Sequence, residues 1–143
     1  MKKICLMILS VWFVFLSVTG CTDLMTYNLS DIIPELMDME TQYPYVEKII
    51  VTKIETGETA VFTEGTDHDR IRMQFEEIQC VRKKNTAEVT SGYSVNFITT
   101  DGNTEVLIPE TDYQAKYVTI GDYRYELLVN GIDLTFFASM FEE

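Results

Sequence analysis

Hydrophobic and polar residues alternate along much of the chain, the pattern of strands with one buried face. In residues 92–100, Tyr93, Val95, Phe97 and Thr99 share one side. Further segments rich in Ile, Val, Thr or Tyr predict strands over residues 47–56, 59–63, 104–108, 117–120 and 123–128. The turn signals that separate strands, and that predict three hairpins, are Thr56-Gly57-Glu58, Asp101-Gly102 and Gly121-Asp122.

Two other segments have the period of a helix. From Asp67 onward, apolar side chains recur at Ile71, Phe75, Ile78 and Val81, which together form one face of an amphipathic helix. The bases that follow, Arg82-Lys83-Lys84, suit the negative end of its dipole. After Asn130-Gly131, a closing helix is predicted by the spacing of Ile132, Phe136 and Met140.

The predicted order of elements is therefore ββαβββ(β)α, over residues 46–143. Consecutive hairpins imply an antiparallel sheet, and helices of this kind pack on one face of such a sheet. We expect an α+β domain with four to six strands and two helices.

The first residues have the organisation of an export signal. Lys2 and Lys3 precede an apolar run over residues 4–16, and small residues lead from there to Cys21. The run is shorter than the roughly 20 apolar residues that a spanning helix needs.

The sequence Val18-Thr19-Gly20-Cys21 resembles the lipobox of bacterial lipoproteins. This resemblance implies that residues 1–20 are a cleaved signal peptide and that the thiol of Cys21 carries diacylglycerol. It places the protein on the extracytoplasmic face of the cell membrane. We expect residues 21–45, with Pro34 and Pro44, to form the lipidated cysteine and a tether, including a possible short helix over residues 31–39.

The net charge of the chain limits the kinds of partner that it can bind. The chain has 143 residues and a formal charge of −12, and the first 20 residues hold two bases and no acid, so the remainder would carry −14. This balance argues against nucleic-acid binding, which requires clustered bases. It equally argues against docking on anionic lipid through a basic face, and two acyl chains would anchor the protein without one.

Few residues offer catalytic or metal chemistry. His68 is the sole histidine, expected to be solvated in the first turn of its helix, and Cys80 is expected to be a buried helix residue about 18 Å away. Zinc needs three or four ligands, and neither acidic segment, 67–69 or 101–105, matches a calcium-binding loop. The sequence thus predicts no catalytic residue, no metal and no cofactor.

Tyrosines gather around the last hairpin: Tyr113, Tyr117, Tyr123 and Tyr125. Aromatic side chains with one wet edge suit contacts with proteins and sugars. Half-exposed strands prefer the same residues for structural reasons. A binding face is therefore a hypothesis, to be sought first around Tyr123 and Tyr125.

The region from about Val46 resembles, in its general style, the small lipoproteins of unknown function of Gram-positive bacteria. We expect a non-enzymatic binding or interaction module that is anchored through Cys21 and contacts a protein or wall component. One alternative is a ligand or cation sensor, or an accessory subunit, that serves a transporter or signalling receptor. The other is a hydrolase of envelope polymers.

Overall fold

The computed structural model describes residues 25–36, 46–76, 78–85, 87–111 and 113–142. Its main feature is an eight-stranded sheet in which every neighbouring pair is antiparallel. In spatial order the strands are β1 (Thr26–Asn28), β4 (Gln79–Lys84), β9 (Tyr123–Leu127), β8 (Tyr117–Ile120), β6 (Asn103–Pro109), β5 (Gly92–Ile98), β2 (Lys48–Lys53) and β3 (Thr59–Phe62).

Helices and a small second sheet complete the described fold. The α-helices are α2 (Leu29–Ile32), α3 (Thr66–Glu76) and α4 (Leu134–Ser139), and residues Pro34–Leu36 form a 3-10 turn, η1. The second sheet pairs β7 (Gln114–Ala115) with β10 (Ile132–Asp133). The α+β class is confirmed, but the predicted range of four to six strands and the count of two helices are both too small.

All three predicted hairpins are present. Strand β2 pairs with β3, β5 with β6, and β8 with β9. Ile120 faces Tyr123 across the last hairpin, so only Gly121 and Asp122 form its turn. Gly121 has φ of +56°, a conformation that a two-residue turn of this kind requires and that glycine adopts without steric cost.

The first long helix is shorter than the sequence predicted. α3 ends at Glu76, and the residues expected to complete it form β4 instead. Ile78 and Val81 therefore match the helical spacing only by coincidence. Strand β4 is hydrogen-bonded to β1 on one side and β9 on the other, and these long-range pairings outweigh the local helical pattern. Arg82, which was placed at a helix end, lies in a strand.

Residues 26–36 are part of the domain. β1 adds the outermost strand next to β4, and α2 and η1 follow it directly. Leu29 and Ile33 are completely buried, and Leu36 is nearly so, in the same hydrophobic core as the central strands. A tether was expected over this region, and the structure shows instead that residues 26–36 pack on the sheet. The proposed cleavage site and residues 37–45 lie outside the described ranges.

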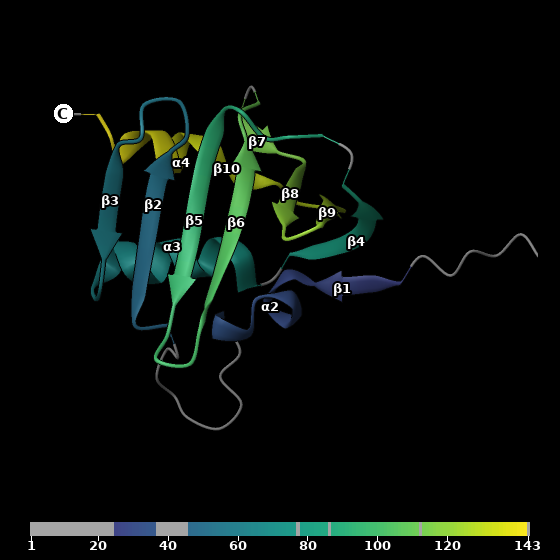
Figure 1. Cartoon of the computed structure of the whole chain (residues 1–143), viewed down its shortest axis with the longest axis horizontal. Helices are drawn as coiled ribbons and strands as arrows, with labels where there is room; N and C mark the ends of the chain where they lie inside the picture. The colour runs from purple at the N-terminus through teal and green to yellow at the C-terminus, as the bar shows by residue number, and fades with distance from the viewer. Residues whose placement is uncertain (1–24, 37–45, 77, 86, 112, 143) are drawn as a thin grey trace, which may run out of the picture.

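Helices α3 and α4 cover one face of the sheet, behind β2, β5 and β6 in Figure 1. The centre of this layer is aromatic. The ring of Phe75 in α3 meets Phe97 of β5 edge-on at a centroid distance of 5.0 Å and Phe137 of α4 at 6.5 Å. All three side chains are fully buried, so they join the two helices to the middle of the sheet.

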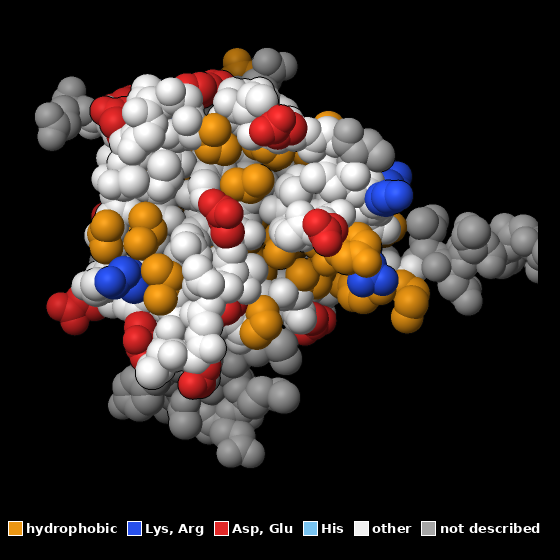
Figure 2. Space-filling view, viewed as in Figure 1, with side chains coloured by type: hydrophobic (Ala, Val, Ile, Leu, Met, Phe, Trp, Pro, Cys, Tyr) orange, Lys and Arg blue, Asp and Glu red, His pale blue; other side chains and the backbone are white. Residues whose placement is uncertain are grey.

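The opposite face of the sheet is not covered by a helix in the described structure, and it points toward the viewer in Figure 2. One row across the strands consists of Thr59, Thr52, Ser94, Leu107, Thr119 and Arg124. Apolar side chains on this face are dispersed among polar and charged ones (Figure 2). This is the ordinary composition of an antiparallel sheet with one solvated face.

The aromatic centre of the core gives a direct prediction. Phe75→Ala removes the ring that links α3 to β5 and α4, and the cavity should lower the free energy of unfolding by roughly 3–5 kcal/mol. The matched control is Met73→Ala on the same helix, because the Met73 side chain is 58% exposed. Urea unfolding followed by circular dichroism measures both. Equal midpoints for the two variants would contradict this view of the core.

Candidate functional site

The best candidate for a functional site is a row of three side chains at one end of the sheet. Arg82 of β4 lies between Tyr27 of β1 and Tyr123 of β9. Its guanidinium carbon is 5.6 Å from the centre of the Tyr27 ring and 4.6 Å from the centre of the Tyr123 ring. We call these three residues the Tyr–Arg row. Both distances are within the range of cation–π attraction.

Strand register brings the row together. Tyr27 is opposite Cys80, and Tyr123 is opposite Lys84, so both flank Arg82 diagonally. Residues that face one another in an antiparallel pair, and residues two apart in a strand, share one side of the sheet. The row therefore lies on the same side as buried Cys80, but Arg82 and Tyr123 are exposed. Along β4, the part of this side that is buried by the core therefore ends between Cys80 and Arg82.

The residues next to the row on the same side of the sheet are buried from solvent. Tyr125, directly opposite Arg82, is only 5% exposed. Burial raises the pKa of its phenol, and the positive charge of Arg82 partly offsets this rise. Cys80 is fully buried, and its thiol donates a long hydrogen bond of 3.5 Å to the carbonyl oxygen of Tyr27. Burial, with a smaller contribution from Asp31, raises the pKa of this thiol to about 11.

Further basic residues lie close to the row in β4 and β9. Lys83, Lys84 and Arg124 join Arg82 at the same end of β4 and β9, and we call these four residues the basic end. They are four of the nine lysines and arginines that follow Cys21. Figure 2 shows basic side chains at the margin where β1 and β4 lie. The sequence-based expectation that bases would not gather on this acidic protein is not met here.

One acid at the basic end has defined partners. The Lys83 ammonium is 2.6 Å from a carboxylate oxygen of Glu126, and the Arg124 guanidinium donates to the other oxygen. Hydrogen bonds from Lys83 and Arg124 lower the pKa of the Glu126 carboxyl, which stays ionised. These three residues lie on the solvated side of the sheet, opposite the Tyr–Arg row. The basic end therefore has charges on both sides of the sheet.

The four tyrosines expected as a binding face do not form one surface. Tyr123 is exposed in the row, whereas neighbouring Tyr125 points into the core. Tyr117 is on the solvated side, where the guanidinium carbon of Arg124 is 4.6 Å from its ring centre. Tyr113 is 75% exposed beside β7, next to the start of α4. Of the four, only Tyr123 belongs to the candidate Tyr–Arg row, and Tyr27 and Arg82 were not among the predicted residues.

The placement of His68 corrects another expectation. The side chain was expected to be solvated, but it is only 2% exposed because it lies on the same side of α3 as Ile71 and Phe75. Its Nδ1 atom is 3.6 Å from the Asp69 carboxylate, and Nε2 has no hydrogen-bond partner in the described structure. His68 is in α3 and Cys80 is in β4, so the single helix on which their separation was estimated does not exist.

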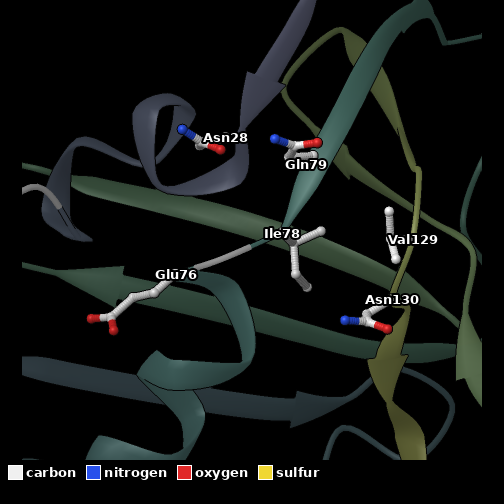
Figure 3. A pocket seen from close by; sticks show the side chains of 6 residues that line it. All are labelled: Asn28, Glu76, Ile78, Gln79, Val129 and Asn130. Carbon is white, nitrogen blue, oxygen red and sulfur yellow. The ribbon is translucent and has the colours of Figure 1, made fainter.

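The surface of the described residues includes three open hollows of moderate size. One, of about 430 Å³, lies where α3 leads into β4 and is lined by Asn28, Glu76, Ile78, Gln79, Val129 and Asn130 (Figure 3). A hollow of about 630 Å³ adjoins Tyr113, and one of about 510 Å³ lies between β6 and β8. The acid among the residues that line the first hollow, Glu76, is paired with Arg72 at 2.8 Å. In the second, the Thr135 hydroxyl donates to Asp133 at 2.6 Å, and the same carboxylate accepts from the backbone N–H groups of Thr135 and Phe136 as the N-cap of α4.

Within the described ranges, no group of three or more His, Cys, Asp or Glu side chains is arranged to hold a metal ion. In those ranges there is also no helix with the length and apolar character needed to cross a membrane. No protein-family model, curated protein or solved structure matches this chain.

The environment of Cys80 predicts its reactivity. The thiolate is the nucleophilic form of cysteine, and a buried thiol with a pKa of about 11 is almost entirely protonated at neutral pH. Iodoacetamide should therefore leave Cys80 unmodified in the native chain and alkylate it rapidly in concentrated guanidinium chloride. Mass spectrometry of the peptide that contains Cys80 measures both. Rapid alkylation of the native chain would place this thiol outside the core.

Proposed function

We propose that this protein is a lipid-anchored, non-enzymatic interaction module on the extracytoplasmic face of the cell membrane. Its anchor is diacylglycerol on Cys21, as the resemblance of residues 18–21 to a lipobox implies. Its contact surface is the Tyr–Arg row with the adjoining basic end. The hollows are open rather than enclosed, so the proposed contact is with a macromolecular surface and not with a small molecule.

The observation that carries this proposal is the pre-organised Arg82 side chain. A free arginine loses rotamer entropy when it binds, but a guanidinium already held by Tyr27 and Tyr123 loses less. Tyrosine and arginine are also the residue types that most often dominate the energy of protein contacts. Tyr125 and Cys80 give the row a rigid, buried base. Exposure, charge and rigidity thus coincide at one place in the sheet.

The anchor is tested by acylation. In cells fed labelled palmitate, the wild-type chain should take up label and Cys21→Ala should take up none, because only the Cys21 thiol is proposed to receive lipid. Cys80→Ala is the control and should retain the label, since Cys80 is buried in the folded domain. Labelled protein is measured after immunoprecipitation. Equal labelling of wild type and Cys21→Ala would rule out this anchor.

The contact surface is tested by site-specific photocrosslinking in intact cells. A photoreactive phenylalanine derivative in place of Tyr123 should give crosslinks to a neighbouring molecule, and Arg82→Ala in the same chain should weaken them. The same derivative in place of Tyr113 is the control, because that residue is more exposed and lies elsewhere. The proposed contact surface is wrong if crosslinks form at position 113 but not at position 123.

A further inference from the structure

We infer that the basic end of β4 and β9 docks on the anionic headgroup layer of the membrane that holds the protein. This inference rests on the proposed anchor at Cys21 and names the partner of the proposed contact surface. It depends on three features of the chain: the direction of β4, the distance from Cys21 to β1, and the distribution of charge.

Strand direction aligns the basic end with the path of the chain toward its anchor. β1 and β4 are antiparallel, and Thr26 is opposite Val81. The end of β1 at Thr26, from which the chain connects to Cys21, is therefore the end toward which β4 continues to Arg82, Lys83 and Lys84 (Figure 1). At about 3.4 Å per residue, Lys84 is about 10 Å beyond the Thr26–Val81 pair in that direction.

Chain length limits how far the domain can be from the lipid. Four residues lie between Cys21 and Thr26, so the five Cα–Cα steps that join them span at most about 18 Å when fully extended. Since Lys84 is already about 10 Å along that direction, it can be no more than about 8 Å short of the level of Cys21 when the segment points straight at the membrane. Any other path of the segment shortens the distance from Thr26 to the level of Cys21.

Charge favours this end of the molecule over the rest. The basic end has four cations. The acids nearest to it in the chain and the sheet are Glu126, which is engaged by Lys83 and Arg124, and the exposed Asp122 in the turn between β8 and β9. The connection to Cys21 adds one more acid, Asp23. The remaining chain is strongly acidic. Electrostatic forces in physiological salt act over about 8 Å, so headgroups at the level of Cys21 attract the basic end, while distant acids are screened. Polybasic segments beside an anchor bind anionic lipid in this way.

The tyrosines of the row fit the same partner. Tyrosine is enriched at the boundary between lipid and water, where its ring contacts apolar groups and its hydroxyl remains hydrated. Arginine and lysine side chains extend their charged groups to the headgroups in a similar manner. A protein that binds the same surface would have to fit between the domain and the membrane, and the short distance from Cys21 to β1 leaves little room for it.

The experiment is hydroxyl-radical footprinting of the full, acylated protein in vesicles. The protein is reconstituted in phosphatidylcholine alone or in phosphatidylcholine with phosphatidylglycerol, and oxidation is read by mass spectrometry. We expect oxidation of Tyr27 and Tyr123 to fall severalfold in the anionic vesicles and to recover in about 1 M salt, where screening shortens to about 3 Å. Oxidation of Tyr113 should not depend on the lipid.

A pair of charge-matched variants tests the cause. Lys83→Glu with Lys84→Glu should abolish the protection of Tyr123 in anionic vesicles. Lys48→Glu with Lys116→Glu changes the net charge by the same amount but leaves the basic end intact, and it should retain protection. Equal loss of Tyr123 protection in both double variants would overturn the inference. It would show that the overall charge, and not the basic end, governs the protection.

Failure of the inference and failure of the proposed function give different results. If the purified protein carries no acyl mass on Cys21, the proposed anchor is wrong, and the inference is wrong with it. If the acylated protein shows no lipid-dependent protection of Tyr27 and Tyr123, only the membrane contact is wrong. Protection of Tyr123 in intact cells but in neither kind of vesicle would overturn the membrane assignment in favour of a protein or wall partner.

Discussion

The fold depends on covering one face of a sheet that is wider than the helices available to cover it. Phe75, Phe97 and Phe137 fix α3 and α4 over the middle of the sheet. Of the shorter elements, η1 contacts β5 and β6, and α2 contacts β1 and α3, so α2 is the helix that reaches the strands beyond. Leu29 of α2 and the inward side chains Cys80 of β4 and Tyr125 of β9 belong to the same core cluster. This cover stops before the ends of β4 and β9 are reached. Arg82 and Tyr123 are exposed on the core-facing side for this reason, so the candidate site is a consequence of how the core is closed.

The sequence predicted those elements whose evidence is local. Hairpins with short turns, and the start of α3, depend on residues close together in the chain, and these predictions are confirmed. β1 and β4 were missed because their evidence is distant: Tyr27 pairs with Cys80, and Val81 pairs with Glu126. Within β4 the buried residues Cys80 and Val81 are adjacent and lie on opposite sides of the sheet, so the strand lacks the simple alternation that identifies a half-buried strand.

The candidate site was predictable only in part, for the same reason. Tyr123 was identified because it belongs to a local hairpin rich in tyrosine, but the side of the sheet on which each tyrosine lies depends on register. Tyr117 and Tyr125 consequently separate onto opposite sides. Tyr27 was not considered because its segment was interpreted as a tether, and Arg82 was assigned to a helix end. Net charge misled as well, since a total of −12 does not reveal that four bases meet at one end of two paired strands.

Moving residues 26–36 from the tether into the domain changes the mechanics of the proposed anchor. A flexible tether of about 25 residues has a root-mean-square length near 28 Å, enough for the domain to turn freely above the membrane. A connection of four residues between Cys21 and Thr26, at most about 18 Å long, would not allow this freedom. The domain must then present a constant side to the headgroups, and the side nearest the connection is the one with the bases. The solvated face of the sheet, which includes the exposed residues Thr59 and Glu105, is not directed at the membrane in this proposed orientation and would remain open to the surroundings. With the proposed anchor at Cys21, strand order and the length of one short segment would determine which surfaces of the protein are available to other molecules.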